Sequence, residues 1–208
     1  MKNSNQTYFA LTLALASGGL QALNASPAPI LVNAPKAMEE DFSTAKAGKA
    51  WVAAKGTWEV LEGALKGIEK ESDNHAAVMT LRAPHTDSAV SFRFQLAGSK
   101  GFSLSYNHPK GHLFRVNFTG ANIQIRTDKD KNDPASKSEL IAQSATKLKQ
   151  GQWYTVLCET KGDKVALQIA GVKVEGSHAA LAQPKTGYRF VLKGEGVMFD
   201  DVNVWKAK

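Results

Sequence analysis

The chain has little cysteine, because Cys158 is the only one among its 208 residues. A lone cysteine excludes an internal disulfide, so the fold must be held together by side-chain packing. Cys158 lies in the largely apolar stretch QWYTVLCET at 152–160. We therefore predict that its thiol is buried and inert rather than nucleophilic.

The chain also lacks a run of the roughly 18 apolar residues that a membrane-spanning helix needs, which excludes an integral membrane protein. The apolar stretch Tyr8–Leu23 is shorter, and Gly18 and Gly19 interrupt it. Lys2 precedes this stretch and the residues NASPAPI follow it, which is the layout of a cleaved secretory signal. We predict a signal peptide at residues 1–25 and export to the periplasm or the cell exterior. An uncleaved, anchored signal is the alternative.

Motifs of several enzyme classes are missing as well. The sequence contains no Gly-x-Ser-x-Gly elbow, phosphate loop, dinucleotide fingerprint or Glu-x-Asp-x-x-Glu strand of the sandwich-type glucanases. The net charge of +7 would attract polyanions. However, lysines are scattered among acidic residues, as at 131–137, and no basic helix or aromatic RNA-binding motif accompanies them. We therefore exclude nucleic acid as a partner.

What the sequence does have is an alternation of apolar and polar residues from Trp51 onward. The stretch SAVSFRFQL at 88–96 alternates as a half-buried strand does. The pattern recurs in GFSLSY, FRVNF and NIQIR between 101 and 126, and in stretches at 57–61, 76–82, 152–160, 164–174, 187–193 and 197–205. About ten or eleven short strands predict an all-β fold, an antiparallel two-sheet jelly-roll sandwich at 49–208 after a linker and edge segment at 26–48. Residues 134–150 fit less well and are expected to form one helical turn or a loop.

Four motifs follow one another in a familiar order. They are an acidic-Phe start at 40–42, GTWEVLEGALKG at 56–67, LKQGQWYTVLCETKGDKVALQIAG at 148–171 and VMFDDVNVW at 197–205. Together they resemble the concanavalin A-like, or laminin G-like, sandwiches of secreted bacterial proteins, and especially the 3-keto-disaccharide hydrolase domain family. The resemblance implies a carbohydrate-directed protein outside the cytoplasm, with a carbohydrate or polyanionic glycan bound or cleaved on the concave sheet.

The chain departs from that family where a catalytic carboxylate is expected. The family pattern has a glutamate in a Glu-x-Gln-Ile-x-Asp strand, whereas FSLSYNHPKGHLFRVNF at 102–118 contains neither Asp nor Glu. We therefore predict that the protein binds a glycan without cleaving it.

Two other functions stay open. One is a glycoside hydrolase acting on 3-keto-sugar disaccharides, in which His108 or His112 works with a metal ion. Glu71, Asp73 and His75 would then complete its site. The other is a structural or protein-interaction domain of the cell envelope, which would fill the concave face with loops.

Alternation leaves a set of polar side chains on the outer faces of the sandwich. The predicted ligand-binding residues are Arg93, Tyr106, Asn107, His108, His112, Arg115, Asn117, Arg126 and Arg189. Guanidinium groups are planar donors for sugar hydroxyls or carboxylates, and Tyr106, Tyr188 or Trp153 would offer a flat surface to a sugar ring. Because strand order is not readable from sequence, the alternative is that these arginines only solubilise both outer faces.

A second set of residues is acidic. Strict alternation in VMFDDVNVW places Asp200 on the side of Val202 and Val204, and Asp201 on the side of Phe199. If the first and last strands pair, Glu40 and Asp41 come near both aspartates, and such an oxygen cluster suits a structural calcium ion. An arginine or lysine partner, or backbone amides, would satisfy the buried carboxylate equally well.

Overall fold

The computed structural model describes residues 27–130 and 132–207, so the predicted signal peptide at 1–25 lies outside the described residues. Within them nearly all of the regular secondary structure is strand. The strands are β1 (Lys36–Glu40), β2 (Trp51–Lys55), β3 (Thr57–Leu61), β4 (Ala64–Ile68), β5 (Ala77–His85), β6 (Ser88–Leu96), β7 (Gly101–His108), β8 (Gly111–Thr119), β9 (Ile123–Thr127), β10 (Leu140–Ser144), β11 (Trp153–Lys161), β12 (Lys164–Ile169), β13 (Val172–Ser177), β14 (Lys185–Leu192) and β15 (Val197–Lys206). Two short 3₁₀ helices, η1 (Glu71–Asp73) and η2 (Ala179–Ala182), complete the described structure.

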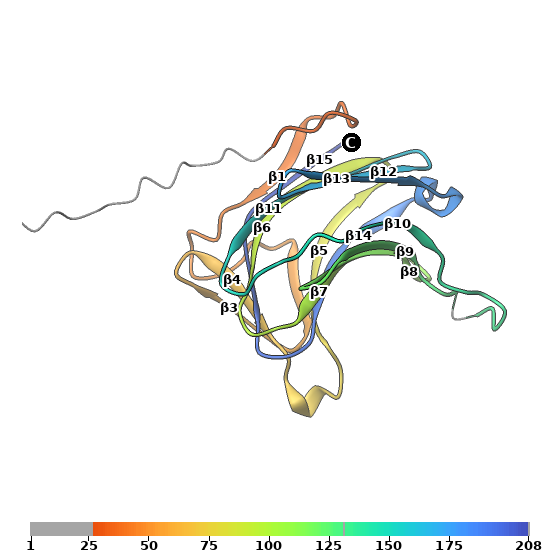
Figure 1. The fold of residues 1–208 in the computed structure, drawn as a ribbon. Coiled ribbons are helices and arrows are strands. Elements are labelled where there is room, and N and C mark those ends of the chain that lie inside the picture. The colour runs from red at the N-terminus through yellow and green to blue at the C-terminus, as the bar shows by residue number, and fades with distance from the viewer. Residues whose placement is uncertain (1–26, 131, 208) are drawn as a thin grey trace, which may run out of the picture.

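These strands form two antiparallel sheets that face each other (Figure 1). The first, called sheet A here, has the order β13-β12-β11-β6-β15-β4-β3, and β1 also pairs with β15. The second, sheet B, has the order β10-β9-β8-β7-β14-β5-β2. The predicted all-β, antiparallel jelly-roll sandwich is thus confirmed. No helix in the described part of the chain has the length and apolarity to cross a membrane.

The structure has more strands than the sequence pattern indicates. The expectation of a helical turn or loop at 134–150 is wrong for Leu140–Ser144, which pairs with β9 at the edge of sheet B. This edge strand is partly exposed on both faces, so it carries no clear alternation. The stretch 164–174 is in fact two strands, β12 and β13, which turn at Ala170 and Gly171 with positive φ angles of 51° and 75°.

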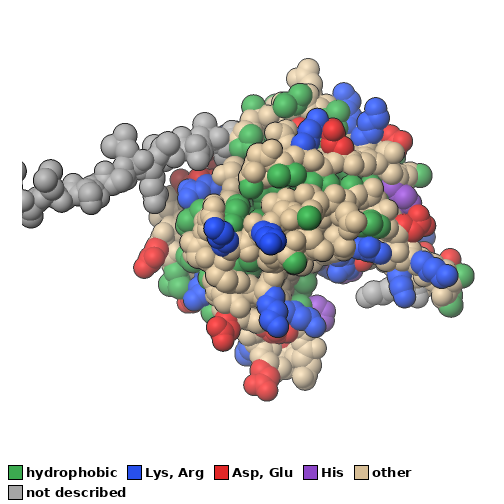
Figure 2. All heavy atoms as spheres, viewed as in Figure 1, with side chains coloured by type: hydrophobic (Ala, Val, Ile, Leu, Met, Phe, Trp, Pro, Cys, Tyr) green, Lys and Arg blue, Asp and Glu red, His purple; other side chains and the backbone are tan. Residues whose placement is uncertain are grey.

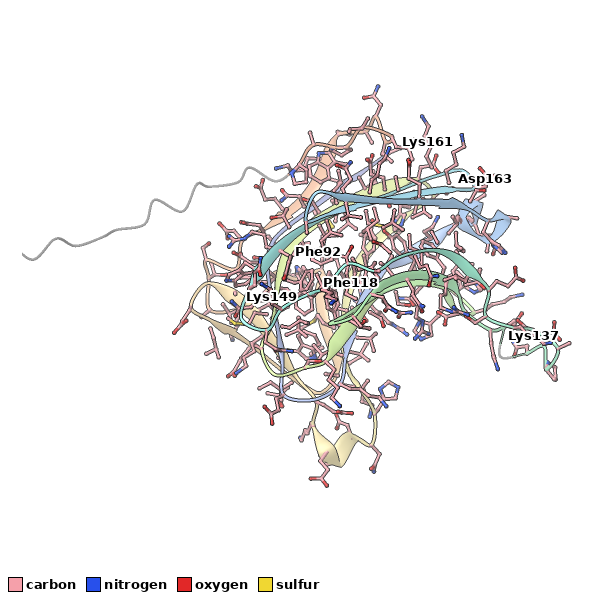
Figure 3. All side chains as sticks on the ribbon, in the orientation of Figure 1. Phe92, Phe118, Lys137, Lys149, Lys161 and Asp163 are labelled. Carbon is pink, nitrogen blue, oxygen red and sulfur yellow. The ribbon has the colours of Figure 1, made fainter. Side chains whose placement is uncertain are left out.

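An aromatic layer between the two sheets forms the core. Phe92 and Phe94 of β6 are completely buried, as the alternation at 88–96 predicts. Phe118 of sheet B lies 6.3 Å from Phe92 and 4.7 Å from Phe102 by ring centroids, and Figure 3 shows Phe92 and Phe118 between the layers. Each such ring buries about 150–250 Å² of surface, so this layer holds the two sheets together.

The single cysteine belongs to the same core. Cys158 is fully buried on β11, and burial raises the pKa of its thiol to about 12. The prediction of a buried thiol is thus confirmed, and because the thiolate is the nucleophilic form, the raised pKa disfavours reactivity.

A strap formed by residues 27–34 lies on the outer face of sheet A. The buried carboxylate of Glu159 on β11 accepts hydrogen bonds from three consecutive amides, those of Ile30, Leu31 and Val32, at 2.8–3.2 Å. Val32 also packs with Leu157 in a small second apolar cluster. The strap therefore compensates a buried charge that would otherwise destabilise the sheet.

We expect the substitution Glu159→Gln to loosen this strap. A glutamine amide retains one acceptor oxygen and presents an NH₂ group to backbone donors, so hydrogen bonds to a charged acceptor, worth about 1.5–3 kcal/mol each, are lost. Hydrogen–deuterium exchange at the amides of Leu31 and Val32 should become at least about tenfold faster. The exposed Glu175→Gln on β13 is the control and should leave both rates unchanged. Equal exchange rates in the wild type, Glu159→Gln and Glu175→Gln would contradict this role of Glu159.

A buried histidine lies at the end of β5. The ring of His85 stacks on Tyr188 at 4.9 Å, and its Nδ1 is 2.6 Å from the carbonyl oxygen of Ala83. Its Nε2 is buried without a hydrogen-bond partner among the described residues. The pKa of His85 is lowered to about 4, mainly because the ring is buried; the Ala83 carbonyl and Asp87 oppose this shift, and the charges of Lys185 and Lys206 contribute to it.

This histidine should make the protein sensitive to acid. Between pH 6.5 and pH 4 the unfolded chain binds a proton that folded His85 does not, so stability decreases as pH falls through that window, by up to about 3 kcal/mol. The variant His85→Phe retains a ring and loses the titration. Urea unfolding at pH 7 and pH 4 should therefore show a smaller loss of unfolding free energy for the variant than for the wild type. Parallel losses in the two proteins would contradict the assignment.

Candidate ligand-binding groove

Three of the predicted arginines form one row across the outer face of sheet B. The strand register pairs Arg189 of β14 with Ser105 of β7, Ser105 with Arg115 of β8, and Arg115 with Arg126 of β9. Neighbouring strands are about 4.8 Å apart, so the row is about 14 Å long. All four residues are opposite in phase to the core residues of their strands, which explains why they face outward.

The row lies in a groove made of two hollows. The first, of about 830 Å³, lies over β14, β7 and β8 and includes Arg189. The second, of about 970 Å³, lies between β8, β9, the 108–111 turn, residues 127–130 and 136–139, and η2, and it includes Arg126. His112, Arg115 and Asn117 line both hollows. The two hollows therefore form one continuous groove.

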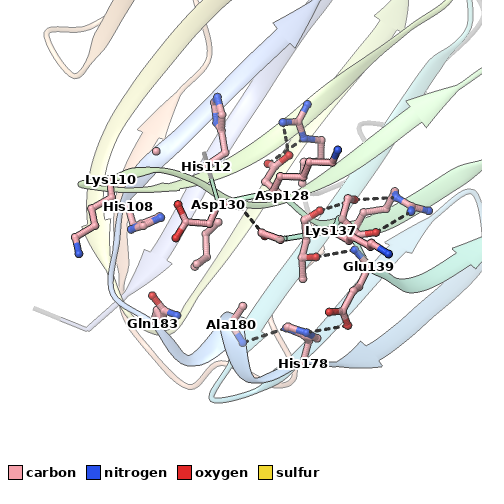
Figure 4. A pocket seen from close by; sticks show the side chains of 18 of the residues that line it. His108, Lys110, His112, Asp128, Asp130, Lys137, Glu139, His178, Ala180 and Gln183 are labelled. Carbon is pink, nitrogen blue, oxygen red and sulfur yellow. Dashed lines mark hydrogen bonds and ion pairs between the residues drawn. The ribbon is translucent and has the colours of Figure 1, made fainter. Parts of the chain in front are cut away.

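The arginines of the row differ in their partners. Arg115 makes a two-pronged ion pair with Asp128, in which Nε donates to one carboxylate oxygen at 3.0 Å and Nη2 contacts the other. Arg126 donates to the hydroxyl of Ser138 at 3.2 Å and to its carbonyl oxygen at 3.4 Å. Figure 4 shows Asp128 beneath its partner at the wall of the second hollow.

A network of polar side chains lies beside the row. Nδ1 of His112 is 2.7 Å from Oδ1 of Asn107 and 2.9 Å from the hydroxyl of Ser105. Because an amide oxygen only accepts, Nδ1 of His112 carries a proton. Two residues before Ser105 on β7, the hydroxyl of Ser103 donates to Oδ1 of Asn117 on β8 at 2.7 Å. The floor of the groove is therefore rich in ordered hydroxyl and amide groups.

The far end of the second hollow carries further titratable residues. His108 and Lys110 come from the β7–β8 turn, and His178 precedes η2 (Figure 4). Nδ1 of His178 accepts from the amide of Ala180 at 3.1 Å, and Nε2 lies 3.5 Å from a carboxylate oxygen of Glu139. Of the predicted site residues, Asn107 is 5% exposed and acts on the groove through its contact with His112.

Besides Asn107, two more of the predicted ligand-binding residues line neither hollow of this groove. Arg93 lies on β6 in sheet A, where it pairs with Asp200 and Asp201 and lies 4.9 Å from the ring of Trp153. The prediction for Tyr106 is also wrong, since its ring is completely buried and stacks on Phe114 at 4.2 Å. Tyr106 has the phase of Phe102 and Leu104, so it faces the core like them.

The other aromatic residues proposed as sugar platforms are not in the groove either. Tyr188 is fully buried and donates to the hydroxyl of Ser88, and Trp153 lies on sheet A. Among the described residues that line the groove, only Phe102 and Phe118 are Phe, Tyr or Trp, and both belong to the core.

The acidic residues proposed as calcium ligands lie near one another but are engaged elsewhere. A β-bulge at Asp201, with φ of 49°, breaks the alternation, so Asp200 and Asp201 both reach Arg93 on the outer face of sheet A. The expectation that they point to opposite sides is therefore wrong. Burial raises the pKa of Asp200, and the charges of Asp201 and Asp41 add to this effect.

Glu40 and Asp41 are held by backbone amides. Glu40 accepts from Phe42 and Gly48 at 3.2 and 2.8 Å, and Asp41 accepts from Ser43 at 3.0 Å, which lowers its pKa. No three acidic, histidine or cysteine side chains come together as a metal site within 27–130 and 132–207. The arginine partner and the backbone amides satisfy these carboxylates, and calcium stays a prediction.

The proposed hydrolase ligands are likewise separate. Asp73 accepts from the amide of Gly56 at 2.6 Å, and Nδ1 of His75 contacts the Ala76 carbonyl. His75 lines the first hollow and His108 the second. His75, His108 and His112 do not form a metal-binding group with Glu71 or Asp73 in the part of the chain that the structure describes.

Several groove residues were not predicted from the sequence. Ser103 and Ser105 have the outward phase in GFSLSY, so the alternation itself contained that signal. Asp128, Ser138 and His178 come from segments with no regular period, and only the tertiary structure brings them to the groove.

Comparison with solved structures places this fold in a known class. The carbohydrate-binding module CBM66 from Bacillus subtilis aligns with a TM-score of 0.62 and 12% identity, over 76% of this chain and 96% of its own. A non-specific endo-β-1,3(4)-glucanase of family GH16 aligns with a TM-score of 0.63 and 13% identity, over 88% and 95%. A laminarinase from Rhodothermus marinus gives 0.60 and 10%, over 82% and 96%. No protein-family model matches this chain, and no curated protein matches it.

The chain therefore has the concanavalin A-like jelly-roll fold of these proteins. At such low identity the likeness concerns the fold alone. The particular 3-keto-disaccharide hydrolase family that the motifs resemble receives no match from any family model.

The Arg115–Asp128 ion pair should be measurable as a coupling in stability. The two side chains are 32% and 15% exposed, so we expect a double-mutant cycle of Arg115→Gln and Asp128→Asn to give about 1 kcal/mol. The exposed pair Lys173–Glu175, at 57% and 58%, is the control and should give a coupling near zero. Equal couplings for the two pairs, measured by urea unfolding, would contradict a structural role for the first.

Proposed function

We propose that this protein is an exported, non-catalytic glycan-binding sandwich, and that its ligand lies in the groove on sheet B. The observation that carries this proposal is the continuous groove of about 830 and 970 Å³ lined by ordered polar donors. Binding sites for small ligands are concave and contain a few well-placed polar groups. The likeness in fold to a carbohydrate-binding module and to glucanases supports a saccharide as the ligand.

The distribution of carboxylates supports binding rather than cleavage. Most glycosidases need two carboxylates flanking the scissile bond. Among the described residues that line the first hollow, none is Asp or Glu. Three acids line the second hollow: Asp128 is ion-paired with Arg115, Asp130 accepts from the amide of Asn132 at 2.9 Å, and Glu139 lies beside His178. The described carboxylates of the groove are thus confined to this hollow, and each of them has a partner there.

The alternatives have less support. A hydrolase acting on 3-keto-disaccharides would need His108 or His112 in a metal site, and the described residues bring no such set of ligands together. A structural domain of the cell envelope would fill the concave face with loops, whereas this face is open along both hollows. Export rests on the signal-like residues 1–25 and remains part of the proposal.

A blocking substitution in the groove tests this function. Asn117 lines both hollows, so Asn117→Trp should fill the groove where they join. We expect the wild type to bind at least one class of saccharide on a glycan array, and the variant to lose at least about tenfold in affinity, which is about 1.4 kcal/mol.

The matched control is Gln168→Trp on the outer face of sheet A, which should bind within about twofold of the wild type. Equal binding by both variants would exclude the groove, and no binding by the wild type to any glycan would exclude the proposed function. Release of reducing sugar from a bound glycan would favour the hydrolase.

A further inference from the structure

We infer that the groove selects an acidic saccharide, and that Arg189 is the residue that recognises its negative group. The inference rests on the proposed function and adds the chemical class of the ligand. It depends on an arginine that forms no ion pair with any described residue.

Arg189 is half-buried on β14, in the middle of sheet B. Its Nε is buried and has no hydrogen-bond partner among the described residues, and no ion pair of those residues includes its guanidinium. A buried donor without an acceptor costs about 1–3 kcal/mol. Such groups are rare in native structures, so this one calls for a functional explanation.

The surroundings of Arg189 do not neutralise it. Its partners across the strands are Thr80 and Ser105, which carry no charge. The first hollow also contains Lys100, Lys193 and Arg115, and its described lining includes no acid. Arg115 already has a carboxylate partner in Asp128. Arg189 is therefore an unpaired cation in a basic hollow, and an anionic ligand would supply its compensating charge.

The geometry also indicates what kind of anion fits. Nε of Arg189 is buried and lacks an acceptor, while the residue as a whole is half-buried and lines the first hollow. The planar guanidinium matches the two oxygens of a carboxylate or sulfate. Arg126, which donates only to the neutral Ser138, lies three strands away in the same row, about 14 Å distant. Two cations without an acidic partner along one groove suit a polymer that repeats its negative groups.

The basic residues outside the groove do not provide the same site. Figure 2 shows lysine and arginine side chains scattered over the surface in view and interspersed with acids. Such an arrangement attracts polyanions weakly and without selection. Selection for an acidic saccharide therefore depends on the row of arginines in the groove.

Binding of matched polysaccharides to the full-length protein tests the inference. The probes are polygalacturonate, which carries carboxylates, dextran sulfate, which carries sulfate esters, and the neutral glucan laminarin. We expect affinity at 0.15 M salt for one or both acidic polymers to exceed that for laminarin by at least about tenfold. Which of the two acidic polymers binds more tightly distinguishes the two possible anions.

Three variants separate recognition from general charge. Arg189→Gln should weaken binding to the acidic polymer at least about tenfold, whereas Arg189→Lys, which keeps the charge but loses the planar fork, should retain part of the affinity. Arg82→Gln is the matched control, because Arg82 is an exposed arginine of the same sheet that lines neither hollow. It should change affinity by less than about twofold. Thermal unfolding of each variant verifies that it is folded.

The possible failures are distinguishable. Preferential binding of laminarin would overturn the acidic ligand and leave glycan binding intact. Binding of no polysaccharide would overturn both proposals. Equal losses for Arg189→Gln and Arg82→Gln, or equally tight binding of single-stranded DNA, would show adsorption of any polyanion and would overturn recognition by Arg189.

Discussion

The packing of aromatic rings between the two sheets is the constraint on which the other features depend. Phe92 from sheet A meets Phe118 and Phe190 from sheet B at 5.5–6.3 Å. Because side chains alternate along a strand, the residues next to each inward-facing ring face the outer side of the sheet. Arg189 faces outward because Phe190 faces the core, and Arg115 does so because Phe114 and Val116 are buried. The residues that line the groove therefore face outward because their neighbours in sequence face the aromatic layer.

The same constraint explains why the groove is polar. The aromatic residues of β7, β8 and β14 belong to the core, so the outer side of these strands has serines, asparagines, a histidine and arginines. A saccharide bound there would be recognised by hydrogen bonds and charge rather than by stacking on a ring. The sequence led us to expect a sugar-binding surface of tyrosine and tryptophan rings. The groove has polar side chains in the place of such rings.

Much of the fold was predictable because apolar and polar residues alternate along most of its strands. Alternation identified most strands and the outward side of Arg115, Arg126 and Arg189. It also contained the answer for Tyr106, whose phase matches Leu104, so that error was one of interpretation. Sheet membership depends on contacts distant in sequence, and for that reason Arg93 could not be separated from the other arginines. The bulge at Asp201 has no sequence signal that alternation alone could reveal.

The strap that binds Glu159 determines on which face of the sandwich the N-terminal end of the described chain lies. Pro27 lies beside Thr155 and Gln168 on the outer face of sheet A, whereas the groove opens on the outer face of sheet B. The polypeptide therefore enters the domain on the side remote from the groove. A protein immobilised through an N-terminal tag would expose its groove to the solution, and attachment of a bulky fusion partner at that end would leave the mouth of the groove unobstructed.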